Sequence, residues 1–533
     1  MKIVIADPIA PAGIQALKAA GFDVIELFAS QELSLLECLQ EAEALIVRSE
    51  TQVTQELINQ APRLKVIGRA GVGIDNIDLN AATESGIVVM NTPTGNTIAT
   101  AELTLSHILC NSRPFSQAVS SMKAGRWDRK NFSGSELFKK HLGILGLGRI
   151  GTEVAKRAQA FGMHVLAHDP FLTEERAKSL GITLSTFDEL LEKSDYITVH
   201  MPLVDGTHHM IDEAAITKMK HGVRLFNCAR GGILKESALI EGLQSGKIAS
   251  AGLDVYEDEP LAEDHPLRQF ENITLTPHLG ASTQEAQESV GLEIADNICQ
   301  LLKNGVIVSA INMPSVDART LDFLHPYLTL GSRLGTLIQQ IAADQAVEKL
   351  VLTYWGKITE QDTLPLTRAI QRGYLLNISG ANNVNDVNAP TKLKHLGIET
   401  EVTQSSKDAD YTELIQIQAL CKEGEHLIAG TLFGKTHTPR VVKLGTRAIE
   451  VSPQGQLLLM ENNDAPGMVG FMGSVLGDDQ VNIANMSLSR DIQGGTALTV
   501  YEIDNPPSDN ALEKIAQHPD ISSVQLVTLE PTP

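Results

Sequence analysis

Cysteines, aromatic residues and long apolar runs are all scarce in this 533-residue sequence. The five cysteines (Cys38, Cys110, Cys228, Cys299 and Cys421) form no Cys-x-x-Cys pair, and their odd number excludes complete disulfide pairing. No segment approaches the roughly 18 consecutive apolar residues that a membrane-spanning helix needs. The sequence opens directly on a strand-like apolar run, without the features of a signal or transit peptide. We therefore expect a cytoplasmic protein that is not embedded in a membrane.

Basic residues are also scarce relative to acidic ones. The sequence holds 43 Lys and Arg against 65 Asp and Glu, which gives a formal net charge of −22. Nucleic acid and anionic membranes are therefore not expected as partners, because the summed field would repel both. A hydrophobic content of 43% predicts globular folding, and the length requires about three or four domains. An anionic substrate would need a local cluster of positive charge.

A glycine-rich segment predicts a dinucleotide-binding loop. An apolar strand at 142–145 leads into Gly146, Gly148 and Gly151, spaced as Gly-x-Gly-x-x-Gly, and a helical pattern continues over 152–161. Gly146 would allow a tight turn, Gly148 the close approach of a pyrophosphate, and Gly151 the packing of helix against strand. Glycines also mark ordinary strand-to-helix turns. The following helix N-terminus, however, would offer amide donors and a positive dipole to phosphate.

An acidic residue after the next strand indicates which dinucleotide binds. The strand at 163–167 is followed by Asp169. Its carboxylate can accept hydrogen bonds from both ribose hydroxyls and would repel a 2′-phosphate. This favours NAD over NADP, although the neighbouring Arg149 and His168 weaken the preference.

Apolar runs alternate with helical patterns through the first half of the chain, as is typical of parallel sheets. Strands are predicted at 3–6, 24–27, 44–47, 65–68 and 87–90, and after the glycine loop at 196–200, 223–227, 251–254 and 273–276. We expect an α/β architecture with two domains. One is a discontinuous, flavodoxin-like substrate-binding domain (1–98 and 285–312), and the other is a doubly wound, parallel-sheet NAD-binding Rossmann domain (99–284). A cleft should lie between them.

Two polar, proline-containing segments near 312–317 and 452–455 predict further domain boundaries. The segment 317–452 begins with a helical pattern at 323–343 and continues with alternating strands, which predicts an α+β intervening domain; the pattern does not decide between a regulatory and an assembly role. The segment 456–530 has the order strand, helix, strand, strand, helix, strand. This βαββαβ order predicts a C-terminal ferredoxin-like domain.

Three residues at predicted strand ends are candidates for catalysis. Oxidation of an alcohol needs a base for the hydroxyl proton, and His278 follows the last strand of the Rossmann sheet. Glu259 follows the preceding strand and could orient the imidazole of His278. Arg230 follows a third strand, and its planar guanidinium suits the carboxylate of a 2-oxo or 2-hydroxy acid.

Each candidate has an ordinary structural alternative. His278 could be a hydrogen-bonded loop histidine, Glu259 part of a solvated acidic turn, and Arg230 a partner in a structural ion pair. Their position at three strand ends of the sheet that carries the glycine loop favours catalysis. His208 and His209 resemble a metal-binding pair, but they have no third ligand at suitable spacing, so no metal is expected.

The motifs around these residues resemble a known family. Asn227-Cys-Ala-Arg-Gly-Gly-Ile-Leu, Gly252-Leu-Asp-Val-Tyr and Pro277-His-Leu-Gly-Ala-Ser-Thr are similar to segments of the D-isomer-specific 2-hydroxyacid dehydrogenases, as are Arg69-Ala-Gly-Val-Gly-Ile-Asp-Asn-Ile-Asp and Asn91-Thr-Pro-Thr-Gly-Asn-Thr. The resemblance covers the whole chain, because long members of the family add an intervening domain and a C-terminal ACT domain.

The resemblance implies functional contacts for named residues. Arg230, Glu259 and His278 would be catalytic. The implied NAD contacts are Gly146, Gly148, Arg149, Ile150, Gly151, Asp169, Cys228, Ala229, Asp254, His278, Gly280 and Ala281. Substrate contacts would come from Arg48, Ser49 and Asn96. Arg69 is a weaker candidate, and Val72 would contribute its backbone.

A basic segment interrupts the acidic chain. Between residues 113 and 140 there are seven basic residues against two acidic ones. They could form a solvated helix face. The resemblance instead implies that the segment crosses a dimer interface, so that Arg129 or Lys130 would reach the substrate phosphate of a neighbouring subunit in a homo-oligomer, either a dimer or a tetramer.

The C-terminal domain has polar residues beside its first predicted helix and second strand. The resemblance to ACT domains implies that serine binds between two copies, through Asn462, Asp464 and Asn482. In the simpler alternative, Asp464 is the N-cap of the helix and Pro466 lies in its first turn.

The resemblance implies NAD-dependent oxidation of 3-phospho-D-glycerate to 3-phosphohydroxypyruvate, the first step of L-serine biosynthesis, with feedback by serine. Another D-2-hydroxy acid, such as glycerate or glyoxylate in the reverse direction, is an alternative substrate. A non-catalytic NADH-sensing interaction module is an alternative of a different class.

Overall fold

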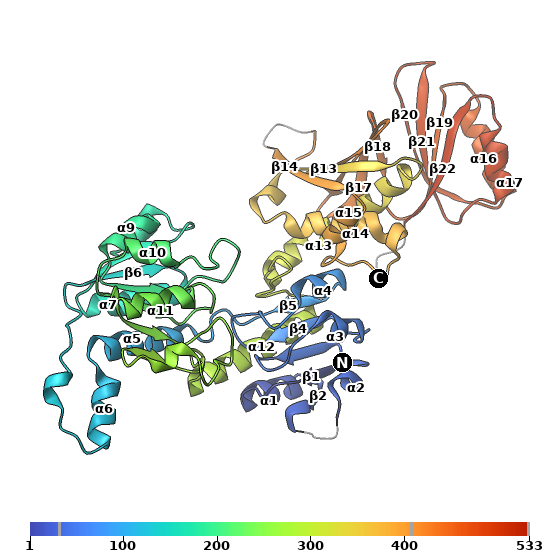
Figure 1. Ribbon diagram of the computed structural model, residues 1–533. Helices are drawn as coiled ribbons and strands as arrows, with labels where there is room; N and C mark the ends of the chain where they lie inside the picture. The colour runs from blue at the N-terminus through green and yellow to red at the C-terminus, as the bar shows by residue number, and fades with distance from the viewer. Residues whose placement is uncertain (30–32, 406–409, 530–533) are drawn as a thin grey trace.

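The computed structural model describes residues 1–29, 33–405 and 410–529, and the strands within these ranges form four sheets. Figure 1 shows two α/β lobes formed by the first half of the chain, followed by two further sheet-containing lobes, with the last of them farthest from the nucleotide-binding lobe. The first three sheets lie within their expected domain ranges, and the last sheet begins at Gly455, one residue before its expected range; the exact boundaries stay a prediction. The expected end of the last domain at residue 530 lies outside the described residues.

The first sheet is parallel and has the order β2-β1-β3-β4-β5, which is the flavodoxin-like order. Its strands are β1 (Lys2–Ile5), β2 (Asp23–Glu26), β3 (Ala44–Val47), β4 (Val66–Arg69) and β5 (Val88–Met90). The helices of this region are α1 (Pro11–Ala19), α2 (Leu35–Leu39), α3 (Gln55–Asn59) and α4 (Leu79–Glu84). Every residue of β3 is buried, because helices cover both faces of the sheet.

The second sheet is also parallel, with the order β12-β11-β10-β9-β6-β7-β8. Its strands are β6 (His141–Leu145), β7 (His164–His168), β8 (Thr183–Leu184), β9 (Tyr196–Val199), β10 (Val223–Asn227), β11 (Ile248–Leu253) and β12 (Ile273–Leu275). Its covering helices are α7 (Arg149–Ala160), α8 (Glu174–Ser179), α9 (Phe187–Lys193), α10 (Glu213–Lys218) and α11 (Glu236–Gln244). The strand order reverses between β6 and β9, where doubly wound folds bind dinucleotides. The doubly wound prediction is confirmed.

Two long helices connect the lobes: α5 (Thr97–Ser112) and α12 (Gln284–Asn304). Helix α12 returns to the first lobe and packs against α1 and β4. The contact with α1 is very close, because a Cβ atom on Gly13 would lie 2.4 Å from the carbonyl oxygen of Gly291. Helix α12, the second segment that crosses between the lobes, is therefore held against α1 by close backbone packing.

The third sheet has the order β14-β13-β15-β16-β17-β18 and is mainly antiparallel. Its strands are β13 (Val347–Trp355), β14 (Glu399–Ser405), β15 (Leu414–Cys421), β16 (Gly424–Phe433), β17 (Thr438–Leu444) and β18 (Arg447–Val451), and its helices are α13 (Ala318–Ile341), α14 (Leu364–Ser379) and α15 (Ala389–His395). Helix α13 begins five residues before the predicted start. The carboxylate of Asp317 accepts a hydrogen bond from the Thr320 amide at 3.0 Å and so caps the earlier turn.

The last sheet has the order β20-β21-β19-β22, and the chain order βαββαβ is as predicted. Its elements are β19 (Gly455–Asn463), α16 (Met468–Asp478), β20 (Ile483–Arg490), β21 (Thr496–Ile503), α17 (Asp509–Ala516) and β22 (Ile521–Leu529). The alternative assignment of Asp464 as a helix cap is wrong. The N-cap of α16 is Gly467, in a left-handed conformation, and Asp464 instead accepts from Arg490 and the Gly494 amide.

The contact between α1 and α12 yields a stability prediction. Replacing Gly13 with Ala would push the two helices apart and should lower the free energy of unfolding by about 1–3 kcal/mol. Thermal denaturation followed by circular dichroism measures the effect. Gly473→Ala in α16 is the control, because a Cβ atom there would meet nothing within 4 Å. A Gly13→Ala variant as stable as the parent would contradict the close packing.

Candidate active site

The three glycines meet the steric requirements of a dinucleotide loop. Gly146 has a φ of +92°, and a Cβ atom on Gly151 would lie only 2.2 Å from the Gly146 carbonyl oxygen. Gly148 faces open space and is the N-cap of α7, which begins at Arg149, three residues before its predicted start. The amides of the first turn of α7 are thus available to a phosphate.

Asp169 lies beside this loop. Its Oδ2 accepts a hydrogen bond from the Leu147 amide at 2.8 Å, and its Oδ1 accepts from the Phe171 amide at 2.9 Å. The adjacent pocket has a volume of about 490 Å³ and is lined by Gly148, Arg149 and Arg176, among others. An open glycine, a helix N-terminus and an oriented carboxylate fit the phosphates and ribose of a dinucleotide.

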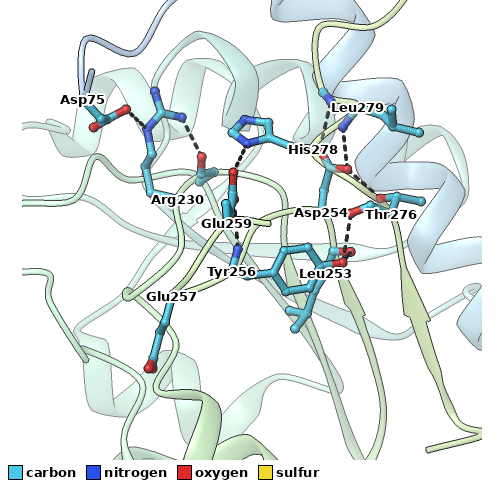
Figure 2. Close-up of polar contacts among 12 residues, drawn as sticks. Asp75, Arg230, Leu253, Asp254, Tyr256, Glu257, Glu259, Thr276, His278 and Leu279 are labelled. Atoms are coloured by element: carbon cyan, nitrogen blue, oxygen red, sulfur yellow. Dashed lines mark hydrogen bonds and ion pairs between the residues drawn. The ribbon is translucent and has the colours of Figure 1, made fainter. Parts of the chain in front are cut away.

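The three catalytic candidates come together at the carboxyl edge of the second sheet, where they follow β10, β11 and β12 (Figure 2). The Nδ1 atom of His278 lies 2.7 Å from Oε2 of Glu259. The other carboxylate oxygen, Oε1, accepts from the Tyr256 amide at 3.1 Å. Since Nδ1 faces a carboxylate, Nε2 is the nitrogen that can exchange a proton with a substrate.

Two opposing effects set the charge state of Glu259. Burial raises the pKa of its carboxyl group. The hydrogen bond and charge of His278, the Tyr256 amide and the charge of Arg230 together outweigh burial and leave the pKa below its ordinary value. Glu259 is thus a carboxylate at neutral pH and can stabilise a protonated imidazole.

Asp254 fixes the turn that carries His278. This carboxylate is fully buried, and it accepts hydrogen bonds from the Thr276 hydroxyl at 2.6 Å, the Leu279 amide at 2.7 Å and the Gly280 amide at 2.8 Å (Figure 2). Burial raises its pKa, and the hydrogen bonds oppose that rise. His278 has a left-handed backbone with a φ of +54°, an unusual conformation that often marks functional sites.

Arg230 forms an ion pair across the cleft. Its Nε donates to Oδ2 of Asp75 at 3.0 Å, and its Nη1 donates to the Ala229 carbonyl at 2.7 Å. Asp75 belongs to the first lobe, so this pair joins the two lobes (Figure 2). Sequence reasoning missed Asp75, although it lies within the quoted Arg69-to-Asp78 motif.

Two further arginines lie near Arg230. Arg69 is half-buried, and burial, followed by the charges of Arg230 and Arg48, lowers its pKa to about 10. The Nε atoms of Arg48 and Arg69 and the Oδ1 of Asn96 are buried without a hydrogen-bond partner among the described residues. The three guanidinium groups therefore provide the positive cluster that an anionic substrate needs, and the Asn96 oxygen can accept from a substrate hydroxyl.

The remaining predicted contact residues near the cleft differ in exposure. Ser49 is exposed, whereas Cys228 is buried at the end of β10, where burial and then Asp254 raise the pKa of its thiol to about 12. Ile150 and Ala229 are half-buried. The Val72 carbonyl accepts from Asn91 Nδ2 at 2.6 Å, which fixes the backbone of the glycine-containing loop after β4.

Arg129 and Lys130 are not in the loops that follow β10, β11 and β12. They are exposed in a short 3₁₀ segment that follows α6 (Phe115–Lys123). Figure 1 shows α6 projecting from the nucleotide-binding lobe on the side away from the first lobe. A substrate contact by these residues stays a prediction.

The three predicted effector residues occupy opposite ends of the last sheet. Asn462 pairs in register with Ala497, at the start of β21, whereas Asn482 precedes Ile483, which pairs with Ile503 at the other end. Asn462 is buried with its Oδ1 unpaired among the described residues, and Asn482 Nδ2 donates to Asp504 at 2.8 Å. One chain alone does not bring Asn462, Asp464 and Asn482 into a common site.

The two adjacent loop histidines have other partners. The rings of His208 and His209 stack at 3.8 Å, and His209 Nε2 lies 3.3 Å from Oε1 of Glu257. Their interpretation as loop histidines agrees with this arrangement. Among the described residues, no helix is long and apolar enough to cross a membrane.

A Rossmann sheet with an arginine and a histidine–carboxylate pair at neighbouring strand ends defines the class of NAD-dependent 2-hydroxyacid dehydrogenases. A family model described as D-isomer specific 2-hydroxyacid dehydrogenase, NAD binding domain, matches residues 105–280. A second model, described as D-3-phosphoglycerate dehydrogenase intervening domain, matches residues 323–445. The predicted cofactor, NAD, is confirmed, and the chain is an NAD-dependent oxidoreductase.

Full-length relatives narrow the class. The chain is 40% identical to D-3-phosphoglycerate dehydrogenase of Archaeoglobus fulgidus, over 99% of this chain and 100% of the relative. It is 39% identical to the Bacillus subtilis protein of the same name, over 99% of both chains. The chain therefore belongs to the D-3-phosphoglycerate dehydrogenase family.

Solved structures resemble the first two lobes. A glyoxylate reductase from Paecilomyes thermophila is 33% identical with a TM-score of 0.54, and covers 58% of this chain and 98% of its own. A D-lactate dehydrogenase from Aquifex aeolicus, complexed with NAD and lactic acid, is 31% identical with a TM-score of 0.52, covering 59% and 100%. These similarities confirm the predicted dehydrogenase fold.

The lowered pKa of Glu259 gives a pH-dependent prediction. A carboxyl group whose folded-state pKa lies below its ordinary value of 4.5 adds stability above that pH and loses it as the pH falls through the folded-state pKa. Glu259→Gln removes this contribution. The difference in melting temperature between the parent and this variant should therefore narrow between about pH 7 and about pH 3.5. Glu263→Gln, an exposed change in the same loop, is the control. A melting-temperature difference that stays constant with pH would contradict an ionised Glu259 paired with His278.

Proposed function

We propose that this chain oxidises 3-phospho-D-glycerate to 3-phosphohydroxypyruvate with NAD, the first step of L-serine biosynthesis. The observation that carries the proposal is the arrangement of Arg230, Glu259 and His278 in a chain that matches this family over its full length. NAD accepts the hydride when bound. The residues of this chain bind and orient the substrate and transfer the proton.

The proton path starts at the substrate hydroxyl. Nε2 of His278 removes the hydroxyl proton as the carbon–hydrogen bond breaks, and Glu259 stabilises the resulting imidazolium through Nδ1. Arg230 binds the substrate carboxylate and polarises the developing carbonyl. In the reverse direction, the same imidazolium returns the proton to the carbonyl oxygen.

The cofactor contacts follow the loop geometry. The amides after Gly146 and Gly148, with Arg149, Ile150 and Gly151 at the start of α7, bind the diphosphate, and Asp169 binds the ribose. Cys228, Ala229 and Asp254 and the turn from His278 through Gly280 to Ala281 border the nicotinamide end.

The substrate phosphate calls for further positive charge. Arg48, Ser49 and Asn96 contact the substrate from the first lobe, with Arg69 behind them. Arg129 of a second subunit completes the site in a homo-oligomer, a dimer or a tetramer, which agrees with its exposure in the segment that follows α6. Arg126, nearby, already has an acidic partner in Asp128 at 3.1 Å.

Serine binding requires two copies of the terminal domain. Asn462 and Asp464 lie at one end of the sheet and Asn482 at the other, so a twofold axis between two sheets would bring opposite ends together. The unpaired, buried Oδ1 of Asn462 supports a ligand role there. All five cysteines are free thiols, which supports a cytoplasmic location.

The substrate assignment predicts the order of activity in an NADH-consumption assay. 3-Phosphohydroxypyruvate should have a kcat/KM at least about tenfold above that of hydroxypyruvate or glyoxylate, because only the phosphorylated acid uses the extra arginines. L-Serine should reduce the rate, and D-serine should not. Faster turnover of glyoxylate would favour a different hydroxy-acid reductase, and NADH binding without turnover of any acid would favour a sensing module.

The role of His278 predicts the effect of one substitution. Asn tolerates the left-handed backbone at this position but offers no base, so His278→Asn should lower kcat by about 10²–10⁴-fold while the affinity for NADH stays nearly unchanged. His209→Asn is a matched control, since His209 also has a positive φ and a carboxylate partner. Equal turnover in the two variants would remove His278 from its assigned role.

A further inference from the structure

Helix α5 buries a histidine behind the catalytic turn. His107 is 4% exposed, and its side chain lies against β11, where a Cβ atom on Gly252 would be 2.9 Å from the His107 Cβ. Its Nδ1 lies 2.7 Å from the hydroxyl of Thr274, and its Nε2 lies 3.0 Å from the hydroxyl of Thr276. The imidazole thus bridges two hydroxyls of the segment that leads into His278.

The directions of these hydrogen bonds follow from the groups at each end. The Thr276 hydroxyl donates its one hydrogen to Asp254 at 2.6 Å, so it must accept from Nε2–H of His107. At the other ring nitrogen, Nδ1 accepts from the Thr274 hydroxyl, which in turn accepts from Nδ2 of Asn111 at 2.7 Å. The result is a one-directional chain from Asn111 through Thr274, His107 and Thr276 to the carboxylate of Asp254.

The chain requires a neutral imidazole with its hydrogen on Nε2. Burial lowers the pKa of His107 to about 4, which agrees with the neutral form at physiological pH. Asn111 is also fixed by the helix, because its Nδ2 donates to the His107 carbonyl at 2.9 Å. Every member of the chain therefore has a defined orientation.

Helix α5 touches the catalytic turn at a second point. The Thr100 hydroxyl, two helical turns before His107, donates to the Gly280 carbonyl at 2.8 Å. The N-cap of the same helix is Asn96. One rigid helix thus contacts the strand and the turn on either side of His278.

We propose that His107 is a positioning residue for the dehydrogenase reaction, which orients the Thr276 hydroxyl on Asp254 and thereby holds the turn that presents His278 to the substrate. This inference rests on the proposed function for its effect on turnover. Its structural part, the fixation of the turn, stands independently. A buried imidazole needs partners for both ring nitrogens, and here both partners are hydroxyls of the segment that leads into His278.

Two substitutions at position 107 separate positioning from packing. Gln places an amide donor near the site of Nε2, whereas Leu fills a similar volume without a donor. His107→Leu should lower kcat roughly tenfold with little change in the substrate KM, because a small displacement of the base slows the chemical step. His107→Gln should recover most of that loss. Thr274→Val, which removes the hydroxyl that orients Nδ1, should have a smaller effect in the same direction.

The control is a buried hydroxyl on the same helix that does not reach Asp254. Ser112 donates to the Ile108 carbonyl at 2.6 Å and contacts the Tyr196 hydroxyl at 3.1 Å, so Ser112→Ala should leave kcat unchanged. Melting temperatures of all variants show how far each one disturbs packing. Hydrogen–deuterium exchange of the segment with the Leu279 and Gly280 amides measures the turn directly, and it should accelerate in His107→Leu but not in Ser112→Ala.

The outcomes distinguish this inference from the proposed function. Equal or higher kcat in His107→Leu than in His107→Gln, with unchanged exchange, would overturn the positioning role and leave the proposed function intact. Full activity in His278→Asn together with faster exchange in His107→Leu would overturn the assigned base but uphold the fixation of the turn. Slower turnover in the Leu variant, recovery in the Gln variant and faster exchange would support both.

Discussion

The buried carboxylate of Asp254 constrains the geometry of the whole site. A carboxylate removed from water is very unfavourable unless hydrogen bonds satisfy it, and here one hydroxyl and two amides do so. Both amides belong to the turn after β12, so the turn must close over the end of β11. That closure forces His278 into a left-handed backbone and sets its imidazole against Glu259.

The charge of the cleft differs in sign from that of the whole chain. The chain carries a net charge of −22, yet its cleft gathers Arg48, Arg69 and Arg230. Asp7 and Asp75 partly offset these charges. Asp7 accepts from the Arg48 amide at 2.6 Å and so positions the backbone at the end of β3. The net negative charge of the chain repels polyanions, whereas the arginines of the cleft attract a small anion.

Much of the fold and of the candidate site could be predicted from the sequence, because short local patterns determine it. The glycine loop, the parallel strands, the βαββαβ order and the three strand-end residues all depend on short-range spacing or on the rule that parallel strands end at one edge.

The features that sequence reasoning missed or assigned wrongly depend on contacts between segments that are distant in the sequence. Asp464 has a cap-like sequence context, but Arg490 from a distant strand binds it. Asp75 pairs across two lobes. The partners of His107 are the hydroxyls of Thr274 and Thr276, which only the tertiary fold places beside it.

The ion pair between Asp75 and Arg230 has a consequence for ligand binding. Under the proposed role of Arg230, a substrate carboxylate would compete with the carboxylate of Asp75, which already pairs with this guanidinium. Asp75 is thus a tethered competitor, and the affinity for an acid reflects the difference between two similar pairings rather than the full strength of one. Because the Asp75 side chain is 67% exposed, water can solvate its carboxylate when the ion pair opens, so the exchange leaves no buried charge unpaired.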